Sequence, residues 1–342
     1  MEHKPVYYSE YLELERILNS QHPVSFQEGN TPAHDEMLFI VIHQAYELWF
    51  KQILFEVQSV IDIMEKPEIN DNSSELQFVV HRLQRVSTIL MLLVQQIEIL
   101  DTMTPMDFLD FRDMLRPASG FQSIQFKILE AKLGLAFEQR HGKAYYTSQL
   151  TPADVEIIKK VESQPSLVQL LNKWLERMPF FDDKEIWKNF AGGSFWDEYK
   201  TIYENSLGEG EKLNAKAFQS VIFGDDSGEY RALSPKASRA ALFIILYRGH
   251  PMLELPFQFL NTLIQIDNQL GNWRSKHVNM VRRMIGTRTG TGGSTGAGYL
   301  QGAMDKHYIY RELSQLHSFL IDRRRLPQLP QKLIEKLGYK FC

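Results

Sequence analysis

His277 is the residue whose surroundings in the sequence most clearly suggest chemistry. At helical spacing around it the chain carries large apolar side chains: Leu263, Ile266, Leu270, Trp273, Met280, Val281 and Met284. A histidine on such a face is more often a core residue bonded to a backbone carbonyl than a metal ligand. A large, flat, apolar cofactor whose iron takes one neutral imidazole would also fit this face. The pattern by itself leaves both interpretations open.

Other metal centres are less compatible with these surroundings. Zinc would require further His, Cys or carboxylate ligands near His277. A thiolate-ligated haem would require a cysteine, and the only cysteine is Cys342 at the end of the chain. A haem ligated by histidine is therefore the metal centre that the sequence favours.

Arg112 is the second candidate for a functional residue. It shares a predicted helix face with Phe108 and Leu115, whereas we expect the acids Asp110 and Asp113 to point elsewhere. A guanidinium among apolar groups must find an anion, and its planar fork suits the carboxylate of a substrate. A snorkelling surface arginine, or a salt bridge to another helix, would also explain this residue.

Phe39 and His43 lie four residues apart, so they share one face of the helix that we expect after Thr31-Pro32. An aromatic wall and a polar hydrogen-bonding group would then face the same space. Core packing explains Phe39 equally well, and His43 could simply pair with Glu47 one turn further along.

Residues 287–298 contain five glycines in twelve positions, so backbone N–H groups there could approach a ligand closely. The segment follows a predicted helix instead of a strand and lacks the Gly-Lys-Ser/Thr ending of a phosphate loop, which argues against nucleotide binding. We expect a flexible or lid-forming loop of small polar residues.

The elements that position these residues are predicted to be helices, because apolar spacing is helical along almost the whole chain. The fold class is therefore all-α, a helical bundle. Helices are expected to begin after Thr31-Pro32 and at Thr104-Pro105, where Asp107 supplies an acid at the third position. A long helix should run from about Pro256 to Ile285 and end at Gly286.

Composition describes an ordinary soluble globular chain of 342 residues with a net charge of -4, which favours neither nucleic acid nor an acidic membrane as a partner. The longest apolar runs fall short of the roughly 18 residues that a spanning helix needs, so we expect core segments. One cysteine permits no disulfide within the chain, and the N-terminus lacks the order of a signal peptide. We expect a cytoplasmic protein. Residues of about 140–235 are more polar and should form shorter helices and loops, a lid-like subregion.

Several motifs, taken together, resemble the tryptophan 2,3-dioxygenase family and occur in that family's order. They are His34 to Ile40 with His43-Gln44 and Glu47-Leu48-Trp49, Phe111-Arg112-Asp113 with Ser119 to Ser123, Trp273-Arg274 with His277 and Met280-Val281, and Gly290 to Ser294. Because these motifs extend over most of the chain, the resemblance is specific.

The resemblance implies an all-α haem dioxygenase fold that binds haem b, with His277 as the axial ligand of the iron. Ser119 and Gly120 would belong to the cofactor site. The iron would be Fe(II) in the active state, and O2 would be the co-substrate.

For the substrate, the resemblance implies that His43 hydrogen-bonds the indole N–H of L-tryptophan and that Arg112 binds the carboxylate. Thr291 would lie near the carboxylate and ammonium, with Phe39 and Phe108 along the indole ring. Position 108 is tyrosine in some members of the family, so a hydroxyl contact is absent here. We expect His43 to be a catalytic positioning group, since an indole N–H is too weak an acid for imidazole to deprotonate readily.

The segment from Tyr7 to Leu12 is similar to the family's N-terminal segment, which reaches the active site of a neighbouring subunit in a homotetramer. Residues 1–30 would then form an arm that supplies Tyr8 and Tyr11 to a neighbour. Residues 31–342 would form the catalytic domain.

The implied reaction adds both atoms of O2 across the indole C2–C3 bond to give N-formylkynurenine, the first step of tryptophan catabolism by the kynurenine route. One alternative is an enzyme of the same fold that hydroxylates or epoxidises a modified indole or another aromatic amino acid. Another is a non-catalytic haem sensor or carrier, which would need no carboxylate clamp, so Arg112 and Thr291 argue against it.

Overall fold

The protein is described by a computed structural model that covers residues 5–67, 69, 74–141, 147–181, 184–187, 194–224, 231–286, 288 and 296–338. Within these ranges every regular element is a helix or a helical turn, and there is no strand. The all-α prediction is therefore confirmed.

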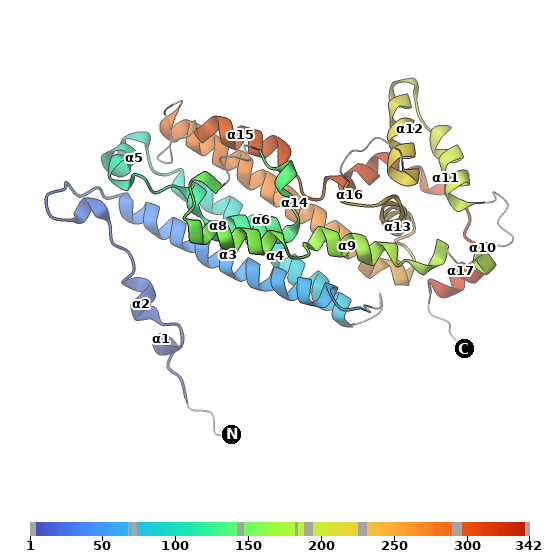
Figure 1. Cartoon of the computed structure of the whole chain (residues 1–342), viewed down its shortest axis with the longest axis horizontal. Helices are drawn as coiled ribbons and strands as arrows, with labels where there is room; N and C mark the ends of the chain where they lie inside the picture. The colour runs from blue at the N-terminus through green and yellow to red at the C-terminus, as the bar shows by residue number, and fades with distance from the viewer. Residues whose placement is uncertain are drawn as a thin grey trace.

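Three long helices form the body of the molecule. They are α3 (Glu36–Met64), α4 (Ser74–Leu100) and α14 (Pro251–Ile285). Helix α4 packs along both α3 and α14, and the three run side by side through the length of the bundle (Figure 1). Their apolar residues recur every three or four positions, and each buried Leu, Ile or Val contributes about 1.5–3 kcal/mol. This spacing explains why helices form here and which faces meet.

By length and composition alone, α4 could cross a membrane, and among the described helices only α4 meets this test. One such helix is weak evidence, because core helices have the same composition. The buried residues of α4 line its contacts with the rest of the bundle: Leu76, Val79, Val80, Leu83, Val86, Ile89, Leu90, Leu93, Ile97 and Leu100. Packing in the core accounts for these residues, while Phe78, Met91 and Ile99 remain exposed on the outer face of α4.

Shorter helices surround the long ones. Their bounds are α6 (Ile124–Leu133), α8 (Pro152–Glu162), α9 (Leu167–Glu176), α10 (Lys184–Trp187), α11 (Phe195–Glu204), α12 (Lys212–Phe218), α13 (Pro235–Leu246), α15 (Gly296–Lys306), α16 (Arg311–Gln315) and α17 (Gln331–Lys336). Helix α9 packs against α3 and α13, and α15 packs along α14. Aromatic residues of α11, among them Tyr199 and Tyr203, are fully buried in the same core as the long helices.

Helix α5 (Pro105–Arg112) begins as the sequence predicts. Thr104 accepts a hydrogen bond from the Asp107 N–H, the Asp107 carboxylate accepts one from the Thr104 N–H, and Pro105 occupies the first helical position. In Figure 1, α5 lies at the end of the bundle where α3 begins.

The predicted start of α3 at Thr31-Pro32 is wrong, because the helix begins at Glu36. The buried Glu36 carboxylate accepts hydrogen bonds from the backbone N–H groups of Val24 and Ser25, both at 2.8 Å. These tertiary contacts hold the preceding segment in an irregular turn, so the chain enters the helix later than local signals indicate.

The predicted start of α14 at Pro256 is also wrong. The helix begins five residues earlier, at Pro251, and contains Pro256. Pro251 occupies the favoured first helical position, whereas Pro256, in the second turn, lacks the N–H that would bond the carbonyl four residues earlier. The predicted end is confirmed, because Gly286 follows the last residue with a φ of 57°.

The N-terminal arm extends away from the bundle in Figure 1. It contains α1 (Tyr8–Tyr11) and α2 (Leu14–Leu18), and neither helix has a buried residue. At its base, the Gln21 amide donates to the Gln44 side chain at 2.7 Å, which ties the arm to α3. The arm therefore presents its apolar side chains outside its own chain's core.

Candidate active site

His277 lies on α14 with its ring 5.0 Å from the ring of Trp273, one turn earlier. Burial, assisted by the charge of His43, lowers the pKa of His277 to about 4. The imidazole is therefore neutral at physiological pH. Within the described part of the chain, its buried Nδ1 atom has no hydrogen-bond partner.

These features can be tested against a haem. An axial histidine must be neutral, and its ring must stand on an apolar surface, as His277 does. The alternative of a core histidine bonded through Nδ1 to a backbone carbonyl finds no support among the described residues. The same residues contain no group of three or more side chains that could hold a metal ion. The surroundings of His277 fit a haem iron that takes a single protein ligand.

His43 lies on α3, one turn after Phe39, and the two rings are 4.1 Å apart. Its Nδ1 atom is 2.6 Å from the Phe39 carbonyl oxygen. Because a carbonyl can only accept, this contact places the hydrogen on Nδ1. His43 is exposed in this chain, but desolvation by the surrounding protein still lowers its pKa, against the opposing effects of the Phe39 contact and the charge of Glu47. The neutral ring therefore has Nε2 as a hydrogen-bond acceptor.

The Glu47 carboxylate forms its hydrogen bonds with the segment around Ser123 and not with His43. It accepts hydrogen bonds from the Ser123 hydroxyl at 2.6 Å and from the Gln125 amide at 2.8 Å. The alternative of a hydrogen-bonded pair between His43 and Glu47 is thus replaced by an electrostatic effect alone. These bonds attach the segment before α6 firmly to α3.

Ser119 and Gly120, the two predicted cofactor residues, belong to this attached segment. Ser119 caps a short helical turn that begins at Gly120, and the Gln122 side chain accepts a hydrogen bond from the Ser119 N–H at 3.2 Å. A Cβ atom on Gly120 would contact nothing within 4 Å, so its backbone faces open space. Gly120 is exposed in this chain.

Helix α5 contributes a second aromatic pair to this region. The Phe108 ring is 5.8 Å from the Phe39 ring, and the Phe111 ring is 5.6 Å from it. A separate apolar cluster joins α3, α5 and α14 here, with Ala33, Ile42, Leu100, Met103, Phe111 and Met284 as its buried members. The cluster fixes α5 against the two histidine-bearing helices.

Arg112 is buried at the end of α5, with 5% of its surface exposed. The alternative of a snorkelling surface arginine is therefore wrong. The expectation that Asp113 points away is also wrong, since its carboxylate lies 3.9 Å from the guanidinium. A tighter helical turn begins at Asp113 and brings this acid back toward Arg112. Asp113 is itself mostly exposed, so solvent screens the attraction.

The structure thus brings together four of the predicted residues. Ring contacts join Phe39, His43 and Phe108, and the contacts of Trp273 with Tyr46 and with His277 place His277 beside α3. Arg112 belongs to the helix that carries Phe108.

Two predicted residues, Tyr8 and Tyr11, lie away from this region. Tyr8 and Tyr11 are 74% and 73% exposed on the arm. Thr291 and most of the glycine-rich loop lie outside the described residues. The loop is shorter than predicted, because residues 296–298 form the first turn of α15.

An aromatic group behind His277 was not assigned from the sequence. The Trp273 ring is 5.0 Å from the Phe126 ring and 6.3 Å from the Tyr46 ring. The Tyr46 hydroxyl donates to the Leu93 carbonyl at 2.6 Å, which joins α3 to α4. Tyr46 lies on the helix face that carries Phe39 and His43, and Trp273 lies on the apolar face around His277, so helical spacing was the available signal.

The fold is that of an all-α protein, and its site is suited to a histidine-ligated haem and an aromatic ligand. The family model described as tryptophan 2,3-dioxygenase matches residues 1–220 and 219–320. The chain is 40% identical to the tryptophan 2,3-dioxygenase of Bdellovibrio bacteriovorus, with the whole of both chains covered. It is 41% identical to that of Alteromonas mediterranea, over 98% of each chain. For Dictyostelium discoideum the identity is 40%, over 99% of this chain and 89% of the relative. The chain belongs to the tryptophan 2,3-dioxygenase family.

Proposed function

We propose that this chain oxidises L-tryptophan to N-formylkynurenine, with His277 as the iron ligand and with α3 and α5 forming the substrate side. The family supports the reaction, in which both atoms of O2 are added across the indole C2–C3 bond. One structural observation carries the assignment of the site: the Trp273 ring contacts both His277 and Tyr46, so His277 lies beside the face of α3 that carries Phe39 and His43.

The family depends on haem, and bound ferrous haem supplies the activation of O2 that a closed-shell indole requires. His277 would hold the iron, since it is neutral and stands on an apolar face. Ser119 and Gly120 would contact the cofactor from the segment that Glu47 attaches to α3.

His43 would orient the indole ring. Its Nδ1 hydrogen is directed to the Phe39 carbonyl, so Nε2 can accept a hydrogen bond from the indole N–H. A neutral imidazole of lowered pKa is a weak base, which favours positioning over proton removal. Phe39, from α3, and Phe108, from α5, would both lie along the indole ring of the substrate.

Arg112 would bind the substrate carboxylate. Its burial raises the strength of a charge-assisted contact, because little water competes there. Thr291 would assist near the carboxylate and ammonium, as the family resemblance implies. Held at both its indole and its carboxylate, the substrate keeps one orientation during the reaction.

The arm would complete the site of a neighbouring subunit in a cytoplasmic homotetramer, with Tyr8 and Tyr11 as the contributed residues. Both are exposed in their own chain, which supports a partner elsewhere. Further apolar side chains are exposed on the outer faces of α3 and α4, namely Val41, Leu48, Phe55, Phe78, Met91 and Ile99. Such faces are available for contacts between subunits.

The test compares two histidines of one helix region. His277→Ala should lose the normal Soret band and the activity. His250 is the N-cap residue of α14, and burial lowers its pKa as well. As the control, His250→Ala should keep both the Soret band and the activity. Absorption spectra of the purified variants, with and without L-tryptophan and O2, give the answer. Full haem loading with an unchanged spectrum in His277→Ala would reject the proposed ligand.

A further inference from the structure

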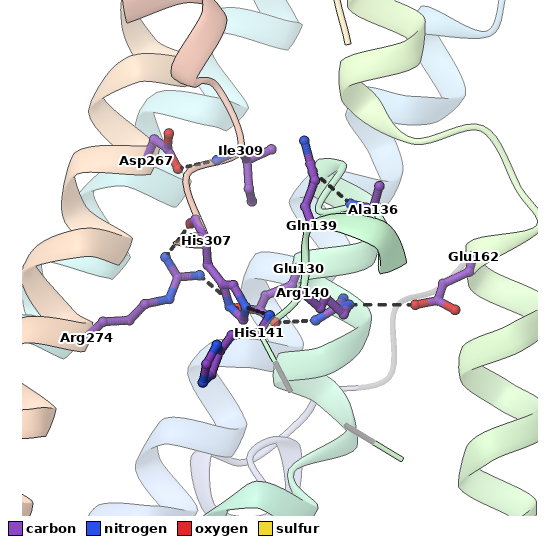
Figure 2. A network of polar contacts seen from close by, with 10 residues as sticks. All are labelled: Glu130, Ala136, Gln139, Arg140, His141, Glu162, Asp267, Arg274, His307 and Ile309. Atoms are coloured by element: carbon purple, nitrogen blue, oxygen red, sulfur yellow. Dashed lines mark hydrogen bonds and ion pairs between the residues drawn. The ribbon is translucent and has the colours of Figure 1, made fainter. Parts of the chain in front are cut away.

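A buried group of charged residues lies beside the helix that carries His277 (Figure 2). Glu130, on α6, accepts hydrogen bonds from Arg140 and Arg274, both at 2.7 Å, and all three side chains are buried. Burial by itself would raise the pKa of Glu130. The hydrogen bond from His307 and the charges of the two arginines outweigh that effect and hold the pKa well below its ordinary value. Glu130 is therefore ionised.

The two terminal nitrogens of the Arg274 guanidinium donate hydrogen bonds to different parts of the chain. One nitrogen donates to the Glu130 carboxylate, and the other donates to the His307 carbonyl at 2.8 Å. His307 follows α15, and its Nε2 atom accepts a hydrogen bond from the His141 N–H at 3.0 Å. Arg274 thus connects α14 to α6 and to the segment after α15.

The connection lies one turn from the proposed iron ligand. Arg274 and His277 are three residues apart on α14, so their side chains are neighbours on the helix surface. A helix with its side chains has a radius of about 5–6 Å, so a rotation of roughly 10° would move the imidazole by about 1 Å. Displacements of that size are large for a metal ligand. Two fixed bonds on this turn oppose such a rotation.

A purely stabilising role explains the arrangement less well. Buried ion pairs often add little stability compared with apolar residues of the same volume, but they do fix orientation where the geometry is specific. Asp267 offers a comparison on the same helix. Its buried carboxylate accepts the N–H groups of Ile309 and Tyr310, both at 3.0 Å. Asp267 therefore anchors the segment after α15 to α14, as Arg274 does. It lies ten residues before His277, which is about 15 Å along the helix.

We propose that Arg274 is a positioning residue for the haem ligand, which acts by fixing the rotation of the α14 turn that carries His277. This inference rests on the proposed role of His277. It assigns to the Glu130–Arg274 pair a role in cofactor geometry, distinct from general stability.

The experiment compares Arg274→Lys with Asp267→Asn in the full-length haem-loaded protein. Lysine keeps the charge but not the fork, so it cannot hold Glu130 and the His307 carbonyl together. Resonance Raman spectra of the ferrous protein measure the iron–histidine stretching band, and transfer to an apoglobin measures haem loss. We expect Arg274→Lys to shift or broaden the band and to accelerate haem loss roughly 10- to 100-fold, as for other residues that orient a metal ligand. Asp267→Asn should keep the parental band even if it lowers the melting temperature as much as Arg274→Lys does.

The two proposals fail in different ways. If His277→Ala keeps the parental iron–histidine band, the ligand assignment is wrong and the positioning role falls with it. If His277→Ala loses the band while Arg274→Lys matches the parent in band and haem loss, only the positioning role is overturned. Equal changes in Arg274→Lys and Asp267→Asn would also overturn it. Arg274→Gln is the second variant, and failure of both Arg274 variants to fold where Asp267→Asn folds would assign Arg274 to folding alone.

Discussion

Arg112 offers the most direct test of substrate recognition. Arg112 is 5% exposed, and the Asp113 carboxylate, 3.9 Å from the guanidinium, belongs to a side chain that is 79% exposed. Solvent weakens that ion pair, whereas a substrate carboxylate bound at Arg112 would be largely shielded from water. Removal of one partner from a buried charge pair typically costs about 2–5 kcal/mol, which is roughly 30- to several-thousand-fold in an equilibrium or specificity constant. Arg112→Leu should lower kcat/KM for L-tryptophan by that order.

Tryptamine, which lacks the carboxylate, separates binding from structure. The parent enzyme should use it poorly, because it leaves a buried guanidinium without the anion of the substrate. In Arg112→Leu the ratio of kcat/KM values for tryptophan and tryptamine should shrink sharply, and Arg112→Lys should restore only part of the loss. Steady-state rates of product formation with both substrates provide the measurement.

Arg116→Leu is the matched control. Arg116 is 57% exposed at its side chain and lies 3.2 Å from the same Asp113 carboxylate, so its removal affects this acid without affecting a buried group. It should leave the ratio of the two substrates unchanged. If Arg112→Leu lowers kcat/KM for both substrates by one factor, Arg112 maintains the structure and does not recognise the carboxylate.

Three further predictions concern the arm, His43 and Glu130. Deletion of residues 1–15 should raise KM for tryptophan and weaken assembly while haem stays bound, and unchanged KM and oligomer size would argue against an arm that acts in a neighbour. Because desolvation lowers the pKa of His43, against the opposing effects of Phe39 and Glu47, kcat/KM should fall only as the pH drops through that lowered pKa, when Nε2 becomes protonated. His43→Gln, which retains an acceptor, should lack this acid limb in pH–rate profiles. Because the folded pKa of Glu130 is depressed, its contribution to stability is present above the ordinary carboxyl range and is lost as the pH falls through the depressed value. The difference in unfolding free energy between the parent and Glu130→Gln should therefore shrink in acid, and a constant difference in denaturant titrations would contradict this.

Local signals predicted those parts of the fold that depend on neighbouring residues. Thr104 and Asp107 satisfy each other's N–H groups, so the start of α5 can be read from four consecutive residues. Gly286 ends α14 by its own backbone conformation. The start of α3 could not be found in this way, because Glu36 bonds to Val24 and Ser25, and a carboxylate in a first turn ordinarily predicts nothing about the chain eleven residues earlier.

The same distinction applies to the site. The apolar face around His277 and the spacing of Phe39 and His43 are helical patterns, and the structure retains both. The partner of Arg274 is 144 residues away on α6, outside every motif that the sequence analysis identified. Pairwise contacts at that separation leave no periodic trace in one sequence. The sequence therefore indicated which helix faces matter but not what holds them in register.

Helix α6 helps to hold the histidines of α3 and α14 in a constant relation. At its first turn, Gln125 bonds to Glu47, which lies one turn beyond His43 on α3. Five residues later, Glu130 bonds to Arg274, which lies one turn before His277 on α14. Both bonds thus originate within about 8 Å along one short helix. Any displacement of α3 relative to α14 near the histidines must stretch one bond or the other, and both involve charged groups for which imperfect geometry is costly. Helix α6, which itself carries neither residue, therefore adds to the packing of α4 on both helices in fixing the relation between the proposed iron ligand and the proposed substrate-orienting group.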